Sequence, residues 1–344
     1  MSDYDYVLPP ELVAHEPVTP RDSSRLLVYS TATNEVFIDT FNHLARYIPA
    51  DSLMVLNDTR VVPARLECTK MTGGTVRILF LFNEWDRKVP IRGLPDRGIK
   101  IGDTLYVRQR PIVRAIAQHN EEFTFELIVS PSEFEGLCHD RGTTPLPPYI
   151  HSTLSEAESR IRYQTVFADK PASVAAPTAS LHFTENVFRS LAEKGIDRTY
   201  LTLHVGRGTF APVSLNALAS GRLHTEPISI SAESAKKISS AQKSGRTIVA
   251  VGTTAMRSLE SAQEYVTQGK GYDGDTSLFI KPPYTFKVAN ALITNFHISN
   301  TSLLMLVDAF LQSKGAKRSW RDIYDIAIKE KFRFYSFGDA MLLI

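Results

Sequence analysis

The chain has 344 residues, which is enough for one large domain or two domains of ordinary size. Hydrophobic residues make up 43% and charged residues 22%, which is the balance of a globular protein with a substantial core. The formal net charge is only +2, so a globally basic surface is excluded and a polyanionic partner would have to bind a local basic patch.

Neither end of the chain carries a targeting or membrane signal. The N-terminal MSDYDYVLPP is acidic and lacks the basic flank and apolar run of a signal peptide. The longest apolar run, SLLMLVDAFL at 302–311, contains Asp308 and is too short to span a bilayer. Cys68 and Cys138 are the only cysteines, too few for a disulfide framework or a cysteine-built zinc site. We therefore expect a cytoplasmic protein without membrane contact.

The first half of the chain predicts a β-rich unit that follows two strands. Short apolar runs at 25–29 and 53–56 predict those strands. From 76 to 129 the runs VRILFLF, DTLYVRQ, VRAIAQH and FTFELIV are rich in β-branched or aromatic residues and are separated by glycines. Consecutive short strands without helices predict a small barrel or sandwich. The proline-rich TTPLPPYI at 143–150 closes this section as a stiff connector.

The second half alternates predicted helices with predicted strands. ENVFRSLAEKGI predicts a helix that ends at Gly195, and TYLTLHV predicts the strand after it. SAESAKKISSAQKSG predicts a helix between a Ser231 cap and Gly245, followed by the buried parallel strand TIVAVGT. AMRSLESAQEYV and TSLLMLVDAFLQS predict two further helices. This alternation predicts an α/β domain over 1–66 and 150–344, with the β-rich unit inserted at 67–149.

Four polar strings stand apart from ordinary core and loop: NDTR at 57–60, PTASLHFT at 177–184, LHVGRGTF at 203–210 and TNFH at 294–297. Each sets hydrogen-bonding or titratable groups among apolar or small residues, which costs free energy unless the groups find partners. Their recurrence predicts one shared polar pocket. For His182, His204 and His297 two interpretations stay open: each is either a hydrogen-bonded histidine of the core or a catalytic histidine. No HExxH-type spacing and no carboxylate cluster favours a metal site.

Other strings leave their alternatives open. GRGTF at 206–210 follows a predicted strand but is neither a dinucleotide fingerprint nor a phosphate-binding loop. VGTTAMRSLE joins a buried strand to a helix, where α/β sheets hold ligands, although the simpler interpretation is that Thr253 and Thr254 cap the helix. Glu226 is either a general acid or base or a loop charge. Asp339, after a glycine in the apolar FRFYSFGDAMLL, predicts a carboxylate buried for a purpose.

Taken together, these strings resemble the S-adenosylmethionine:tRNA ribosyltransferase-isomerase family of queuosine biosynthesis. The resemblance runs in one order through YVLPPELVAHEP, RDSSRLLV, LNDTRVVPARL, PLPPYI, RYQTVFA, VAAPTASLHFT, TLHVGRGTFAPV, AVGTTAMRSLE, ALITNFH, SLLMLVDAF and FRFYSFGDAMLL. It spans nearly the full length and is weakest in the predicted barrel. The resemblance implies a large α/β domain with an inserted small antiparallel β-barrel, in agreement with the pattern of elements.

The resemblance also implies a reaction. The ribosyl group of S-adenosylmethionine would move onto 7-aminomethyl-7-deazaguanine at the wobble position of tRNA. Isomerisation would give epoxyqueuosine, with adenine and methionine released. No metal or separate cofactor is implied, because the positive sulfur acidifies the ribose 5′ carbon and lets a base remove a proton. We expect a monomer.

Such chemistry needs a base, an acid and a polar cage. The expected titrating set, with its roles undivided, is His182, His204 and Asp339. The expected substrate-positioning residues are Asn57, Asp58, Arg60, Thr178, Arg257, Asn295, His297 and Arg333. Candidates for phosphate or methionine-carboxylate contacts are Arg60, Arg65, Arg207 and Arg333. The basic residues expected to meet tRNA on the barrel are Arg92, Arg97, Lys100, Arg108 and Arg110.

Departures from the family pattern leave a second function open. Ala172 and Ser180 stand where the family has glycine, and Gly221 stands where it has a histidine. Pro283 replaces a glycine, and Arg77 replaces a glutamate. Several of these positions fall in segments expected to line the ligand. The alternative is therefore a divergent paralogue that binds S-adenosylmethionine but uses another acceptor or does not catalyse transfer.

Overall fold

The computed structural model describes residues 2–88, 90–206 and 213–344. Its large sheet contains β1 (Arg25–Tyr29), β2 (Val36–Thr40), β3 (Leu53–Asn57), β12 (Asp197–Leu203), β13 (Arg222–Ile230), β14 (Ile248–Val251), β15 (Tyr272–Leu278), β16 (Ala291–Asn295) and β17 (Ala340–Leu343). A closed barrel contains β5 (Arg65–Lys70), β6 (Thr75–Phe80), β7 (Ile91–Pro95), β8 (Thr104–Val107), β9 (Arg110–His119) and β10 (Glu122–Leu127). Between them, β4 (Thr59–Val61) pairs in parallel with β11 (Lys170–Ser173).

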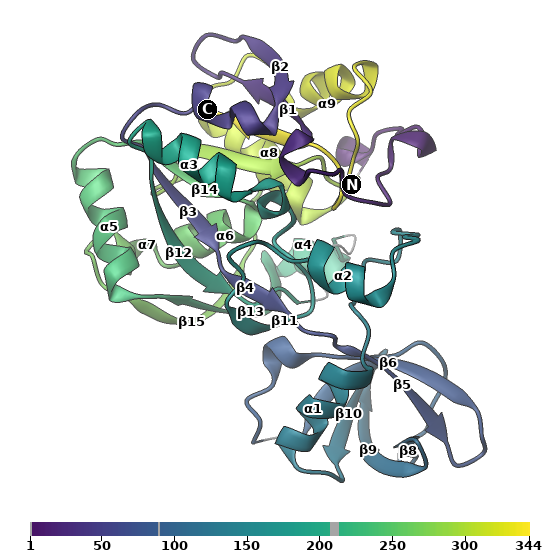
Figure 1. The fold of residues 1–344 in the computed structure, drawn as a ribbon. Helices are drawn as coiled ribbons and strands as arrows, with labels where there is room; N and C mark the ends of the chain where they lie inside the picture. Colours follow the sequence, from purple (N-terminus) through teal and green to yellow (C-terminus); the bar gives the residue numbers. More distant parts are fainter. Residues whose placement is uncertain (1, 89, 207–212) are drawn as a thin grey trace.

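The α-helices lie mostly in the large domain, and Figure 1 shows the barrel below it. They are α1 (Pro131–Arg141), α2 (Glu156–Arg162), α3 (Glu185–Glu193), α4 (Leu215–Ser220), α5 (Ala232–Lys243), α6 (Thr253–Ser261), α7 (Gln263–Val266), α8 (Ser302–Ser313) and α9 (Trp320–Lys329). Within the described residues, no helix is long and apolar enough to cross a membrane. The predicted fold class, a large α/β domain with a small antiparallel barrel, is confirmed.

The order of the large sheet creates a ligand-binding position. Four neighbouring strands, β12, β3, β14 and β16, run parallel to one another. The strand β3 comes first in the sequence; β12 pairs on one side of it and β14 on the other. In open α/β sheets such a reversal leaves a crevice beyond the carboxyl ends of the strands, where ligands bind. The functional site is therefore to be sought at the ends of these strands.

Both faces of the large sheet are buried, which explains the continuous apolar runs of its strands. Leu53 and Val55 of β3 pack in one cluster with residues of α5, α6, α8 and α9. Met54 and Leu56 pack in another cluster with α3 and the 3-10 helix η4 (Phe41–Arg46). Alternate side chains of a strand point to opposite faces, so one apolar run supplies both layers. This rigid sandwich fixes the positions of the strand ends.

The barrel has a hydrophobic core of its own. In β6, Val76, Ile78 and Phe80 alternate with more exposed residues, as expected for a strand with one face inside a barrel. The helix α1 adds Phe134, whose ring lies edge-on to Phe80 with centroids 4.9 Å apart. Of the two predicted architectures, barrel or sandwich, the barrel is correct. The apolar patterns do not predict β5 and β7, because few of their residues are apolar.

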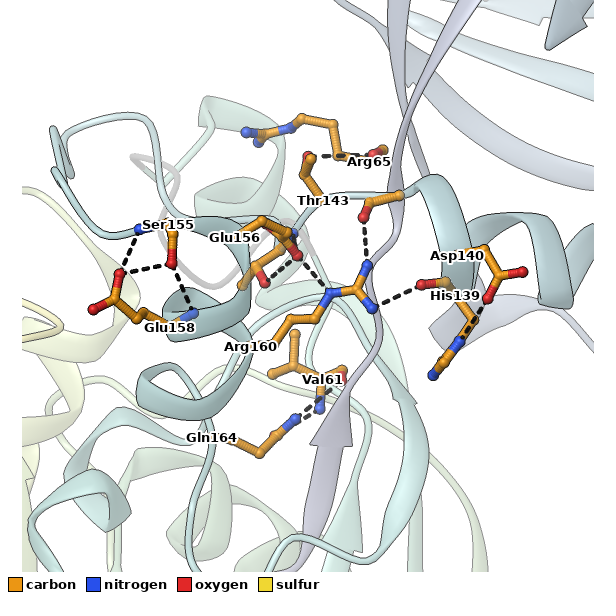
Figure 2. Close-up of polar contacts among 12 residues, drawn as sticks. Val61, Arg65, His139, Asp140, Thr143, Ser155, Glu156, Glu158, Arg160 and Gln164 are labelled. Atoms are coloured by element: carbon orange, nitrogen blue, oxygen red, sulfur yellow. Dashed lines mark hydrogen bonds and ion pairs between the residues drawn. The ribbon is translucent and has the colours of Figure 1, made fainter. Parts of the chain in front are cut away.

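A cluster of polar contacts ties the two domains together where the chain returns from the barrel (Figure 2). The guanidinium of Arg160 in α2 donates to the carbonyl oxygens of His139 at 2.7 Å and Gly142 at 2.6 Å, at the end of α1. Its Nε contacts Glu156 at 2.7 Å, and Glu156 accepts the backbone N–H of Thr144 at 3.0 Å. These contacts hold the barrel against the α/β domain. The domain boundaries 66/67 and 149/150 stay a prediction.

Candidate active site

Polar residues from separate parts of the sequence meet at the carboxyl ends of the four parallel strands. Asn57 ends β3, His204 follows β12, Gly252 follows β14 and Asn295 ends β16. Because these strands are neighbours in the order β12-β3-β14-β16, their ends form one continuous edge. Three of the four polar strings, together with the VGTT segment, therefore contribute residues to this edge.

Asn57 holds the strand ends together. Its Nδ2 donates to the carbonyl of Leu203 at 3.0 Å, and its Oδ1 accepts the backbone N–H of Leu203 at 3.0 Å. Its amide also contacts the N–H of Thr59 and, at 3.3 Å, the hydroxyl of Thr254. The side chain has no exposed surface. A fully bonded buried amide positions the backbone rather than a substrate, so these contacts favour a structural role for Asn57.

His204 faces a large cavity. Its Nδ1 lies 2.8 Å from the hydroxyl of Thr59, and burial lowers its pKa from the usual value. It lines a cavity of about 790 Å³ between the barrel and the α/β domain. A cavity of several hundred Å³ matches the size of small-molecule sites, so His204 is well placed for contact with a ligand.

His182 is enclosed in the core. Its Nδ1 lies 2.8 Å from the hydroxyl of Ser24, and its Nε2 lies 3.4 Å from Nδ2 of Asn295. Burial lowers the pKa of His182 to about 3, with smaller contributions from Arg333 and Arg21. The ring is therefore neutral at pH 7, and the amide of Asn295 donates to Nε2 while Nδ1 donates to Ser24. A neutral ring with both nitrogens engaged is a poor general acid.

His297 and Thr178 lie in the same enclosed group. The Nε2 of His297 is 2.7 Å from the hydroxyl of Thr294, and burial lowers its pKa to about 3. The hydroxyl of Thr178 donates to Oδ1 of Asn295 at 2.9 Å. Thr178, Asn295 and His297 line two cavities of only about 10 and 20 Å³. Such volumes hold about one water molecule. The structure brings these predicted residues together, but in a space too small for a substrate.

Arg257 and Glu226 form a buried ion pair beside a second cavity. Both side chains are 5% exposed, and Nη1 of Arg257 contacts Oε2 of Glu226. Glu226 also accepts the backbone N–H of Gly206 at 2.9 Å, and Nε of Arg257 donates to the carbonyl of Leu278 at 3.1 Å. The remaining nitrogen, Nη2, is buried and has no partner among the residues that the structure describes. The pair lines a cavity of about 350 Å³, so Glu226 is not a solvated loop charge.

Asp339 and Arg333 fasten the C-terminal strand. The carboxylate of Asp339 accepts the backbone N–H groups of Arg25 at 3.0 Å and Arg333 at 2.8 Å. The guanidinium of Arg333 donates to the carbonyls of Glu16 at 3.0 Å and Phe337 at 2.7 Å. Burial raises the pKa of Asp339. These contacts favour a structural role, because they hold the chain where it enters β17 between β16 and β1.

Asp58 and Arg60 lie just beyond the strand ends. Oδ1 of Asp58 accepts the hydroxyl of Thr202 at 2.7 Å, and burial raises the pKa of Asp58. Nη2 of Arg60 donates to the carbonyl of Ala168 at 2.5 Å. Asp58, just before β4, is thereby bonded to β12, and Arg60 of β4 is bonded to the segment that precedes β11. Their roles in substrate binding stay a prediction.

The helix cap predicted at Thr253 and Thr254 is wrong. Gly252, with φ +89°, is the N-cap of α6 and both threonines lie inside the helix. A side chain at the N-cap would otherwise accept the first free N–H groups. No side-chain cap hydrogen bond is made at the start of α6 within the described residues.

The remaining predicted residues are those at the end of the LHVGRGTF string and the basic residues of the barrel. Residues 207–210 of the LHVGRGTF string, including Arg207, lie outside the described residues. On the barrel, Arg92 pairs with Glu84 and Glu122, and Arg110 pairs with Glu133. The charge of these two arginines is therefore locally balanced. Arg97, Lys100 and Arg108 are exposed.

Apart from the basic residues expected to meet tRNA, the sequence patterns assign no site residue to the barrel. The 790 Å³ cavity is nevertheless lined by Phe82, Asn83 and Trp85 from the β6–β7 connection. A signal was present: Asn83 interrupts the apolar run ILFLFNEW, just as the histidines interrupt theirs. Among the described residues, no group of three His, Cys, Asp or Glu side chains forms a candidate metal site.

Comparison with known proteins identifies the family. The model of the queuosine biosynthesis protein family matches residues 1–343. The chain belongs to this family. A relative from Carboxydothermus hydrogenoformans, named S-adenosylmethionine:tRNA ribosyltransferase-isomerase, is 40% identical over 100% of this chain and 99% of its own. A relative of the same name from Anaeromyxobacter sp. is 42% identical over 100% of this chain and 98% of its own.

A solved structure agrees with the fold. The crystal structure of S-adenosylmethionine tRNA ribosyltransferase from Thermotoga maritima superposes with a TM-score of 0.56 at 30% identity. The superposition covers 99% of this chain and 100% of that one. Together with the full-length relatives, it makes this family member an enzyme of the ribosyltransferase-isomerase class in queuosine biosynthesis.

Proposed function

We propose that this chain moves the ribosyl group of S-adenosylmethionine onto 7-aminomethyl-7-deazaguanine in tRNA and isomerises it to epoxyqueuosine, releasing adenine and methionine. The observation that carries the proposal is that His204 and the Arg257–Glu226 pair line two cavities beside the ends of the parallel strands. The names of the full-length relatives support S-adenosylmethionine and tRNA as the substrates.

His204 is the proposed proton acceptor. The positive sulfur of the substrate acidifies the ribose 5′ carbon, so removal of a proton there opens the reaction. The lowered pKa of His204 keeps the ring neutral at pH 7, which is the form a general base needs. With Nδ1 donating to Thr59, Nε2 is left to take the proton. No metal or separate cofactor is part of this proposal, since the sulfonium itself supplies the activation.

The Arg257–Glu226 pair is the proposed site for the methionine portion of the substrate. Nη2 of Arg257 is a buried donor with no partner in the described part of the chain, and a carboxylate is the ligand that a guanidinium binds best. Glu226 beside it is a carboxylate for an ammonium group. The methionine portion carries an α-carboxylate for Arg257 and an α-ammonium for Glu226, and both groups are attached to the same carbon. This places methionine in the 350 Å³ cavity and the reacting ribose towards His204.

The tRNA is proposed to approach over the barrel. Arg97, Lys100 and Arg108 are exposed there and are the proposed phosphate contacts. Recognition of the wobble position, a monomeric state and a cytoplasmic location are parts of the same proposal.

The direct test is the dependence of adenine release on the acceptor. Purified protein is incubated with S-adenosylmethionine alone, with unmodified tRNA, or with tRNA that carries 7-aminomethyl-7-deazaguanine. We expect release of adenine only with the modified tRNA. Release without tRNA, or with a different acceptor, would favour the divergent paralogue. No release under any condition would overturn the proposed activity.

A further inference from the structure

The barrel carries a buried amide that its own fold does not use. Asn83 lies in the 3-10 helix η5 (Phe82–Glu84), between β6 and β7, and is only 4% exposed. Within residues 2–88, 90–206 and 213–344, neither Oδ1 nor Nδ2 has a hydrogen-bond partner. Most buried polar side chains are hydrogen-bonded, and leaving one unsatisfied costs free energy. An apolar residue of the same shape would avoid that cost, so the amide calls for an explanation outside the barrel core.

The surroundings of Asn83 place it at the junction of the domains. The η5 segment packs against β11 and β13 of the α/β domain. A Cβ atom added to Gly206 would lie 3.0 Å from Nδ2 of Asn83, so the backbone at Gly206 packs closely against this amide. Asn83 lines the 790 Å³ cavity together with His204 and Trp85. The unused amide therefore lines the same cavity as the proposed proton acceptor.

The charges around this cavity argue against an anionic ligand at this point. Of the residues that line it, Arg92 is paired with Glu84 and Arg87 is paired with Glu135 at 2.5 Å. Aromatic surface is supplied by Trp85, whose ring packs edge-on against Phe82 at 5.7 Å. A neutral planar ligand with adjacent donor and acceptor atoms fits these walls better than a phosphate does. The edge of a purine base has that chemistry.

We propose that Asn83 is a specificity-determining residue that hydrogen-bonds the edge of a purine base in the cavity between the barrel and the α/β domain. An asparagine amide offers one donor and one acceptor side by side, which matches a base edge in two simultaneous hydrogen bonds. The amide is buried against Gly206, so binding requires η5 to move slightly away from it. The inference rests on the proposed function, which supplies two sources of such a base: the adenine of S-adenosylmethionine and the deazaguanine of tRNA.

The test substitutes Asn83→Leu, which keeps the size of the side chain and removes both polar atoms. We expect thermal stability equal to or above that of the wild type, because an unsatisfied group is removed. We also expect one purine substrate to bind roughly ten- to hundredfold more weakly, the scale of one bidentate base contact. Asn186→Leu, on the exposed face of α3, is the matched control and should change neither property.

Two measurements separate the sources of the base. Titration calorimetry with S-adenosylmethionine alone reports on adenine and needs no turnover, so it remains informative if the proposed reaction fails. The concentration of modified tRNA that gives half-maximal adenine release reports on the deazaguanine. Weaker binding of S-adenosylmethionine by Asn83→Leu means that Asn83 contacts adenine. A higher half-maximal concentration of modified tRNA, with normal S-adenosylmethionine binding, means that Asn83 contacts the deazaguanine.

The proposal is overturned if Asn83→Leu leaves both values at the wild-type level, since the amide would then have no role in recognition. Asn83→Ala gives a second, smaller substitution in case leucine disturbs folding at the domain junction. If the wild type shows no reaction with modified tRNA, the proposed function fails. Calorimetry with S-adenosylmethionine still tests the inference in that case, and normal binding by both folded variants overturns it.

Discussion

The burial of His182 predicts how strongly the free energy of unfolding depends on pH. Its pKa is lowered to about 3 from the usual 6.5, so the folded state excludes a proton that the unfolded chain takes up. A histidine with a depressed folded pKa contributes stability above its unfolded pKa, and this stability is lost as the pH falls from 6.5 towards 3. Each pH unit well inside that window costs about 1 kcal/mol, so the fall from pH 7.5 to 4.5 costs roughly 3 kcal/mol.

The substitution His182→Asn removes the titration and keeps an amide that can donate to Ser24. Urea unfolding of both proteins at pH 7.5 and 4.5 gives the free energies of unfolding. The wild type's advantage over the variant should shrink by roughly 3 kcal/mol between these pH values, because the other titrations cancel in the difference. His119→Asn, at the exposed end of β9, is the control and should show no comparable pH dependence.

A difference that stays constant between pH 7.5 and 4.5 would refute this reasoning. It would mean that His182 keeps an ordinary pKa in the folded protein, and it would return the residue to the groups that can exchange protons near neutral pH. The predicted result leaves His182 as a neutral support for Asn295, with His204 as the histidine available for catalysis.

Three further substitutions test the remaining assignments. His204→Ala should lower the rate of adenine release about a hundredfold or more. The free energy of unfolding should fall by only about 1 kcal/mol, because the hydrogen bond to Thr59 is lost. Reduced stability with an unchanged rate per folded molecule would make His204 a core histidine. Arg257→Lys keeps the charge but removes the free guanidinium donor, so KM for S-adenosylmethionine should rise with little change in kcat, and an unchanged KM would contradict the methionine site. Asp339→Asn should cost about 1–3 kcal/mol of unfolding free energy, because the carboxylate accepts two backbone N–H groups, while the rate per folded molecule stays normal. A large loss of rate in Asp339→Asn would instead restore Asp339 to the mechanism.

The large domain could be predicted well because its signals are local. Buried parallel strands such as TIVAVGT are short apolar runs, and the helices α3 and α5 are followed by Gly195 and Gly245 with φ of +76° and +67°. Ser231 caps α5 as predicted, by accepting the N–H of Ser234. The barrel was harder, since β5 and β7 have few apolar residues and also pair with β8 and β10, which are distant in sequence.

The site was predictable as a set of polar strings but not as a geometry. Burial inside apolar runs marked His182, His204 and His297 equally, yet only His204 lines the 790 Å³ cavity. That distinction depends on how the barrel packs on the strand ends, which no local pattern contains. Asp339 has the sequence context of a functional carboxylate, but its partners are backbone N–H groups of Arg25 and Arg333 that the fold brings to it.

The most direct measurement of the central claim is the identity of the modified nucleoside. Transfer RNA carrying 7-aminomethyl-7-deazaguanine is incubated with the protein and S-adenosylmethionine labelled in the ribose, then digested to nucleosides and analysed by mass spectrometry. The account predicts that the ribose label appears in epoxyqueuosine at the wobble position, with one adenine released for each nucleoside formed. Release of adenine with the deazaguanine nucleoside unchanged in mass would contradict it.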